Sequence, residues 1–221
     1  MTFARTDEQR MLADQLAGVL GKGATGWDGV VVAHGLDLLG VPESDGGLGT
    51  DIRDGAVVAA AFGRDNTELP WAEHWAAPQS EPAAENARTL LHCAEQVGLC
   101  ETMLRDTALF MRDRKQFGVA IAKFQALRHR MADMAMLLEQ ARAITDVAID
   151  TFEEGERRMR AVSAARVICE DAARAIGEGA VQIHGAMGLT DELRLAGFFR
   201  RSRALMLRDG GARRHLRSYA A

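Results

Sequence analysis

Short helical patterns alternate with glycine-rich breaks in the N-terminal part of the chain. Thr6-Asp7-Glu8-Gln9 has the form of a capping box, in which the Thr hydroxyl and the Gln amide satisfy free amides at a helix start. Apolar residues then recur at three- and four-residue steps as far as Gly21. The glycines at 21 and 23 favour a left-handed cap. This pattern predicts a first helix that ends at Gly21–Gly23.

Two further helices are predicted before residue 64. Residues 27–39 form a shorter helical stretch, which runs into a loop over 40–49 that holds one proline and four glycines. Asp51 is a good N-cap for a helix rich in alanine and valine, expected to end near Gly63. Residues 70–86 contain three of the four prolines and no periodicity, so we expect the domain boundary there.

The remaining sequence has the pattern of long helices. Helical spacing extends over 87–111, 124–152 and 156–184, with shorter stretches near 192–205 and 212–219. No segment shows a convincing strand alternation. We therefore predict an all-α protein, with an N-terminal helical domain over 1–80 and an antiparallel four-helix bundle domain over 81–221.

Composition excludes several classes of function. The formal net charge of −4 gives no reason to expect a nucleic-acid partner. The three cysteines have no CxxC or Cys/His spacing, so we expect free buried thiols and no metal site. The charged N-terminus is unlike a signal peptide, and no apolar run is long enough for a membrane span. A soluble, cytoplasmic protein is expected.

Four segments, in order along the chain, resemble acyl-CoA dehydrogenases. The first is a glycine loop, and the second contains an RKQFG motif followed seven residues later by Gln125. The third is similar to the family's QxxGGxGxTxE segment, and the fourth lies where the family has its catalytic carboxylate. The segments are GVPESDGGLG (40–49), RDRKQFGVAIAKFQALRHRMADM (112–134), AVQIHGAMGLTDE (180–192) and RALMLRDGG (203–211).

The resemblance implies that one domain of the family is missing. A β domain lies between the two helical domains in acyl-CoA dehydrogenases, whereas this chain has about twenty loop-like residues in that place. Deleting the β domain can leave a foldable helical remnant if the uncovered face is made polar or is covered by another chain.

The RKQFG segment implies a flavin-binding role. The family's matching Arg binds the FAD pyrophosphate of a neighbouring subunit, and a guanidinium suits phosphate because it donates two parallel hydrogen bonds. The resemblance assigns this role to Arg114, with Gln116 and Phe117 at the same site and Gln125 in the motif that follows. The alternative for Arg114 is a surface residue at a helix end.

A second cofactor segment is implied near residue 185. The family's Gln contacts the adenosine side of FAD, which assigns Gln182, and its paired glycines let the backbone approach the nucleotide. This chain keeps Gly185 but has Ala186 in the second position, where a Cβ can forbid a positive φ. His184 is expected to pack at the helix end.

Asp209 matches the catalytic base, usually Glu, that removes the α-proton of an acyl-CoA. Asp is one methylene shorter than Glu, and a misplacement of about 1 Å costs roughly a hundredfold in rate. The alternative is that Asp209 caps the last helix. Gly211 stands where the family has Thr, which removes another flavin contact.

Three functions remain open from the sequence. The chain is a subunit of a heteromeric dehydrogenase of acyl-CoA thioesters, in fatty-acid or steroid side-chain metabolism, sharing FAD with a full-length homologue. Alternatively it is a non-redox structural subunit or a repurposed helical enzyme that has lost FAD. In a third reading it binds FAD alone. All three predict a homo- or hetero-oligomer.

Overall fold

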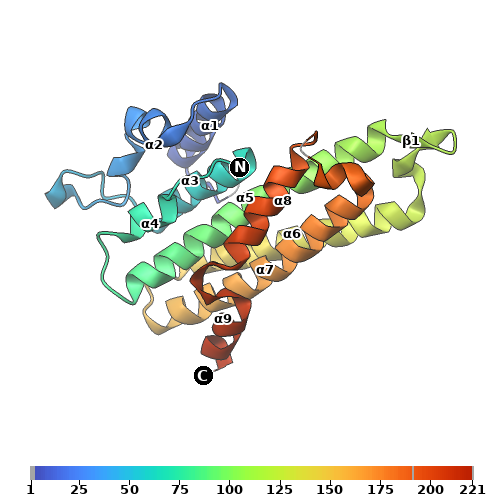
Figure 1. Cartoon of the computed structure of the whole chain (residues 1–221). Helices are drawn as coiled ribbons and strands as arrows, with labels where there is room; N and C mark the ends of the chain where they lie inside the picture. Colours follow the sequence, from blue (N-terminus) through green and yellow to red (C-terminus); the bar gives the residue numbers. More distant parts are fainter. Residues whose placement is uncertain (1–2, 191, 221) are drawn as a thin grey trace.

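The protein is built almost entirely of helices joined by short connections (Figure 1). The structure is a computed structural model and describes residues 3–190 and 192–220. A two-stranded antiparallel hairpin is the only sheet in these residues. The helices and strands are α1 (Asp7–Gly21), α2 (Gly26–Val30), α3 (Ile52–Asp65), α4 (Trp71–Ala76), α5 (Ala83–Asp113), β1 (Lys115–Gln116), β2 (Val119–Ala120), α6 (Gln125–Asp150), α7 (Glu156–His184), α8 (Leu195–Met206) and α9 (Gly211–Ala220).

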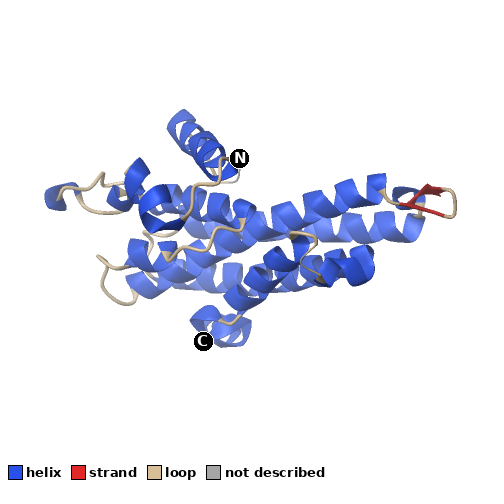
Figure 2. Ribbon diagram, turned by 45° about the horizontal axis from the view of Figure 1, so that its top comes forward, coloured by secondary structure: helices blue, strands red, loops and turns tan. Residues whose placement is uncertain are grey.

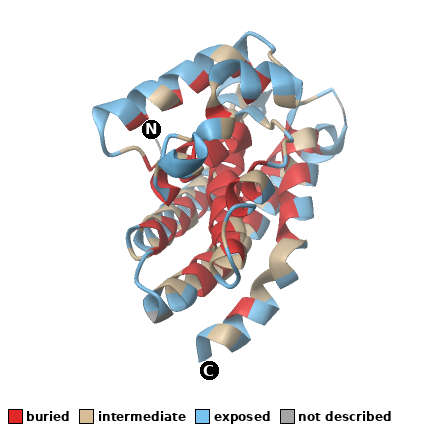
Figure 3. Ribbon diagram, turned by 90° about the vertical axis from the view of Figure 1, so that its left-hand side faces the viewer, coloured by how far each residue is buried: buried red, intermediate tan, exposed pale blue. Residues whose placement is uncertain are grey.

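The C-terminal part is an antiparallel bundle of α5, α6, α7 and α8. Helices α5 and α7 run toward the β1–β2 hairpin, and α6 and α8 return from that end (Figures 1 and 2). Helix α5 is buried on all sides over residues 89–100, whereas α6 has a buried face toward the bundle and an exposed outer face (Figure 3). The predicted all-α class and antiparallel bundle are therefore confirmed.

Helix α3 lies against α5 at an unusually close crossing. A Cβ on Gly63 would come within 2.0 Å of the Glu95 carbonyl oxygen, and one on Gly98 within 2.2 Å of the Ala60 carbonyl oxygen. Two glycines thus let the backbones approach each other. This crossing joins the N-terminal helices to the bundle, and one hydrophobic core extends through both.

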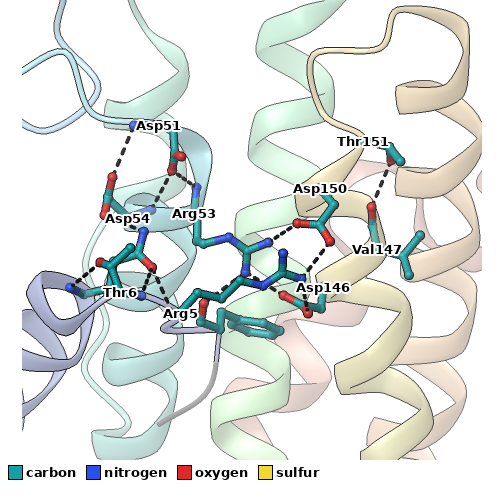
Figure 4. Close-up of polar contacts among 11 residues, drawn as sticks. Arg5, Thr6, Asp51, Arg53, Asp54, Asp146, Val147, Asp150 and Thr151 are labelled. Atoms are coloured by element: carbon teal, nitrogen blue, oxygen red, sulfur yellow. Dashed lines mark hydrogen bonds and ion pairs between the residues drawn. The ribbon is translucent and has the colours of Figure 1, made fainter.

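A cluster of four charges makes a second connection between the N-terminal helices and the bundle (Figure 4). The Arg53 side chain, 8% exposed, forms ion pairs with Asp146 and Asp150 of α6, and Arg5 pairs with the same two carboxylates. Arg53 also donates to the Phe3 carbonyl at 3.0 Å. A buried guanidinium is tolerated here because two carboxylates and a carbonyl satisfy it.

The two helix starts predicted from capping residues are confirmed. Thr6 and Gln9 form the capping box of α1, which ends at Gly21. Asp51 caps α3 and forms a capping box with Asp54. Helix α3 continues two residues beyond Gly63, since Asn66 adopts the left-handed conformation that ends it.

Three predictions about local structure were wrong. The single helical stretch over 27–39 is broken into α2 and two 3₁₀ turns, which are separated by Gly35 with φ +67°. The supposedly irregular segment 70–86 contains α4, whose tryptophans Trp71 and Trp75 are buried. The segment after α5, where no strand was expected, forms the β1–β2 hairpin. No strand occurs between residues 70 and 86, in agreement with the expected absence of a β domain between the two helical regions.

All three cysteines are free and buried, as expected from the sequence. No helix among the described residues is long and apolar enough to cross a membrane. The division into domains at about residue 80 stays a prediction.

Candidate functional site

A cavity of about 250 Å³ opens at the hairpin end of the bundle. It brings together the end of α5, strand β1 and the end of α7, which are far apart in sequence. Four of the seven residues proposed from the sequence line it: Arg114, Gln116, Gln182 and Gly185. The other lining residues are Phe110, Ile121, Ile183, His184 and Met187.

Arg114 is the C-cap residue that directly follows α5. Its backbone is extended and its N–H donates to the Phe110 carbonyl at 2.8 Å, so the chain leaves the helix and enters β1. The exposed guanidinium makes no ion pair or hydrogen bond with any described residue. An unpaired guanidinium at the mouth of a cavity is suited to bind a phosphate or a carboxylate.

Gly185 ends α7 in a conformation that favours glycine, with φ +65°. No atom lies within 4 Å of the place that a Cβ would take there, so the backbone borders open space. Ala186 lies in the 3₁₀ turn that follows and has no positive φ. The Ala in place of a second glycine therefore introduces no backbone strain.

His184 and Phe110 form a wall of the cavity that the sequence did not predict. Their rings are stacked with centroids 4.1 Å apart, and His184 Nδ1 lies 2.9 Å from the Ala180 carbonyl oxygen. His184 is buried, as the expected packing role requires. The apolar side of the cavity thus comes from a ring pair on α5 and α7 whose proximity depends on the tertiary fold.

Phe117 and Gln125 do not line this cavity. Phe117, at the tip of the hairpin, is 91% exposed with φ +51°, and its ring lies edge-on to Phe124 at 6.2 Å. Gln125 begins α6 and borders a separate hollow. The roles assigned to these two residues by resemblance remain predictions.

Asp209 lies in a buried charge cluster between α5, α4 and the turn after α8. Its carboxylate is 2.7 Å from His92 Nδ1, and His92 Nε2 is 3.7 Å from Glu73. The side chains of His92 and Asp209 are only 3% and 10% exposed. Arg166, also buried, donates to the carbonyls of Leu205 and Arg208 and so holds the turn that carries Asp209.

This environment fixes the protonation of the cluster. Burial disfavours the charged imidazole, but the hydrogen bond to Asp209 and the proximity of Glu73 outweigh it and raise the pKa of His92 to about 9. Burial likewise opposes ionisation of Asp209, yet His92 holds the pKa of that carboxyl below its ordinary value. The interaction with His92 lowers the pKa of Glu73 to about 2. At neutral pH an imidazolium therefore lies between two carboxylates.

Asp209 shows none of the contacts expected of a helix cap. The free amide at the start of α9, on Ala212, donates to Glu170 at 2.7 Å. Asp209 instead adopts a left-handed conformation, with φ +56°, and its carbonyl oxygen lies 3.0 Å from His215 Nε2. The structure thus replaces the capping interpretation with a buried ion pair. The catalytic role stays a prediction.

The two regions are far apart within one chain. His92 lies on α5 and Arg114 caps its end, 22 residues further on, which corresponds to about 33 Å along the helix axis. The cavity at the hairpin can hold an anionic group, whereas the Asp209 cluster has little exposed surface.

Among the described residues, no group of three His, Cys, Asp or Glu side chains is arranged to hold a metal ion.

Sequence comparisons connect the chain to one family. The profile described as "Acyl-CoA dehydrogenase, C-terminal domain" matches residues 83–221. Acyl-CoA dehydrogenase IpdE2 of Mycolicibacterium smegmatis is 36% identical over 132 residues, which cover 60% of this chain and 41% of that protein. The probable acyl-CoA dehydrogenase fadE25 of Mycobacterium leprae is 34% identical over 118 residues, covering 53% of this chain and 30% of that protein. The chain thus spans less than half of the length of either relative.

Solved structures share the fold. The ChsE4-ChsE5 complex from Mycobacterium tuberculosis superposes with a TM-score of 0.88 at 15% identity, covering 100% of this chain and 98% of the matched chain. Butyryl-CoA dehydrogenase from Megasphaera elsdenii gives a TM-score of 0.59 at 26% identity, covering 62% of this chain and 36% of that chain. At 15% identity, the first match supports the fold alone.

Proposed function

Since this chain belongs to the acyl-CoA dehydrogenase family, we propose that it supplies one half of a flavin site shared with a second, full-length polypeptide. In this assembly an acyl-CoA thioester is oxidised between its α and β carbons. The observation that carries the proposal is the convergence of Arg114, Gln116, Gln182 and Gly185 on one open cavity. These are the residues that the resemblance assigns to binding the FAD of a neighbouring subunit.

The size and chemistry of the cavity fit part of a dinucleotide. Pockets that enclose a whole small ligand are roughly 300–1,000 Å³, so a cavity of about 250 Å³ accommodates only a fragment of FAD. The unpaired guanidinium of Arg114 suits the pyrophosphate, and the open backbone at Gly185 leaves space for it. The remainder of the cofactor must be held by another polypeptide.

The position of Asp209 also supports a shared site. It lies near His92, about 33 Å along α5 from Arg114, so these residues face different places on the molecule. Its carboxylate is paired with an imidazolium and its pKa is lowered, which makes it a weak acceptor for an α-proton. We therefore assign the catalytic base to the second polypeptide.

FAD, when bound, supplies the hydride acceptor of the reaction. The residues of this chain bind and orient it. Arg114 and Gln182 would hold the nucleotide through their guanidinium and amide N–H groups, and Gln116 on β1 would add a second amide. The stacked pair of Phe110 and His184 excludes water from one wall. ChsE4-ChsE5, which shares this fold, is by its name a complex of two proteins.

The test is the flavin content of the purified complex with a full-length homologue, compared between the wild type and Arg114→Ala. We expect the variant to lose flavin while the complex stays assembled, because only a phosphate contact is removed. Arg213→Ala is the matched control, since Arg213 is exposed, makes no ion pair within the described residues and lies on α9. Unchanged flavin occupancy in Arg114→Ala contradicts the proposal.

A second candidate function is a non-redox structural subunit. The observation that favours it is the ion pair of Asp209 with His92, together with Gly211 in place of a flavin-contacting Thr. A complex that contains this chain and is colourless, and that stays colourless with added FAD, favours this alternative.

A further inference from the structure

The segment around the hairpin carries positive charges and no acidic residue. The seventeen residues from Arg114 to Arg130 include five Arg and Lys residues and no Asp or Glu. The whole chain has a formal net charge of −4, so the +5 of this segment leaves −9 on the remainder. The hairpin and the start of α6 therefore carry positive charge that no acidic residue of the segment offsets. A second basic stretch, residues 194–217, has eight Arg residues against one Asp.

These basic side chains have no partners within the described part of the chain. No side-chain ion pair or hydrogen bond is formed there by Arg114, Lys115, Lys123, Arg128, His129 or Arg130. All six residues are exposed. Arginines elsewhere are commonly paired, as Arg142 is with Glu101 and Arg194 with Asp106. Unpaired like charges that lie close together repel one another, so an acidic partner gains free energy by covering them.

The proposed nucleotide accounts for only one of the six. Arg114 lines the cavity, whereas Lys123, Arg128, His129 and Arg130 do not. We name these four residues the α6 basic surface. Lys123 lies in the 3₁₀ turn before α6, and the other three lie in the first two turns of that helix. Arg128 and His129 also line a hollow of about 350 Å³ with Gln125 and Ala132.

We propose that the α6 basic surface docks against an acidic face of the second polypeptide that completes the flavin site. This inference rests on the proposed function, because it names the chemistry of the partner at that site. The surface adjoins the hairpin, so a polypeptide that reaches the cavity also covers α6. Complementary charge steers the encounter and fixes the register of the two chains.

The chain itself cannot supply the acidic counterpart. Its excess of acidic over basic residues lies in residues 1–80, which have twelve Asp and Glu against five Lys and Arg. Figure 1 shows this region at the opposite end of the molecule from the hairpin. A second copy that docked there would join head to tail, which leads to a ring or an open filament and not to a closed pair. A different polypeptide is therefore favoured.

The experiment measures binding to the full-length acyl-CoA dehydrogenase homologues of the source organism, each produced together with this chain. Dissociation constants are determined at 50 and 300 mM NaCl for the wild type and for Lys123→Glu/Arg128→Glu/Arg130→Glu. The control is Lys22→Glu/Arg213→Glu/Arg217→Glu, which makes the same change in net charge at three exposed residues without partners among the described ones.

We expect the α6 variant to bind the homologue at least about tenfold more weakly than the wild type at 50 mM NaCl. Its dissociation constant should also change much less between 50 and 300 mM NaCl, whereas the control should stay within about twofold of the wild type. Wild-type affinity in the α6 variant, or an equal loss in the control, overturns the docking surface. Self-association that the α6 variant abolishes also overturns it, because the occupant is then a second copy.

Flavin content separates this inference from the proposed function. At saturating partner concentration, the α6 variant is expected to keep its flavin, whereas Arg114→Ala loses flavin without losing the partner. A complex that depends on the α6 basic surface but never contains flavin contradicts the proposed function and supports the docking surface. The absence of a complex with any homologue contradicts both.

Discussion

The two ends of α5 differ in whether their polar side chains are exposed and unpaired or buried and paired. At the hairpin end, Arg114 is exposed and without a partner among the described residues, beside an open cavity. Near the other end, His92 is buried between Asp209 and Glu73 and has both ring nitrogens engaged. The resemblance assigns a function to both ends, Arg114 as a flavin ligand and Asp209 as a base. Only the hairpin end offers groups that remain free to bind a ligand.

This difference indicates which half of a shared site the chain supplies. Groups that bind a ligand must lack strong partners in the free protein, whereas a buried ion pair is part of the fold. The Asp209 cluster connects α4, α5 and the turn after α8, and we interpret it as structural. Replacing residues in it should therefore change stability, and replacing residues at the hairpin should change binding.

The largest effect is expected from His92→Ala. Removing the imidazolium leaves the carboxylate of Asp209, whose side chain is 10% exposed, without its partner. Breaking a buried pair in this way costs about 3–5 kcal/mol of the free energy of unfolding. Urea unfolding followed by circular dichroism measures the change. A loss below about 1 kcal/mol would show that the cluster contributes little to the fold.

The pH dependence of stability should follow from the same residue. The pKa of His92 is raised from 6.5 to about 9, so its stabilising effect is complete below pH 6.5 and is lost as the pH rises through 9. We expect the free energy of unfolding to fall by about 3 kcal/mol over this range. The decline should be absent in His92→Gln, and its persistence in that variant would assign it to another group.

A smaller effect is expected at Gly98, which lies on α5 between the two regions. An added methyl group would meet the Ala60 carbonyl oxygen at 2.2 Å and force α3 away from α5. We expect Gly98→Ala to cost about 1–3 kcal/mol of stability. Gly18→Ala on α1 is a useful comparison, because no atom lies within 4 Å of its added Cβ. Equal melting temperatures for the two variants would argue against the close crossing.

The smallest change in stability is expected at the hairpin end. Gln182→Ala and Arg114→Ala remove exposed side chains that have no partners within the described residues, so each should change the free energy of unfolding by less than about 0.5 kcal/mol. Thermal unfolding of the chain alone checks this. A large loss at either position would mean that the residue supports the fold and that the contrast between the two regions is incorrect.

Local signals in the sequence predicted most of the helices. The capping boxes at Thr6 and Asp51 depend on residues three positions apart, and the long helices follow from apolar spacing. Helix α4 was missed because it has only six residues and follows a proline. The β1–β2 hairpin was missed because its strands have two residues each, too few for an alternating pattern.

The candidate site was only partly predictable. Motif resemblance named Arg114, Gln116, Gln182 and Gly185, and the fold brings these four together. The pairing of Asp209 with His92 joins residues 117 positions apart, and no local pattern in the sequence indicates it. For the same reason, the stacking of Phe110 on His184 emerges only when α5 and α7 are placed side by side.

The most direct test of the shared site is a titration with FAD, followed by the change in flavin absorbance and fluorescence. It compares this chain alone with its complex with a full-length homologue. We expect the complex to bind FAD at least about a hundredfold more tightly, because the cavity of the isolated chain encloses only a fragment of the cofactor. Tight, stoichiometric binding of FAD by the isolated chain would contradict the account.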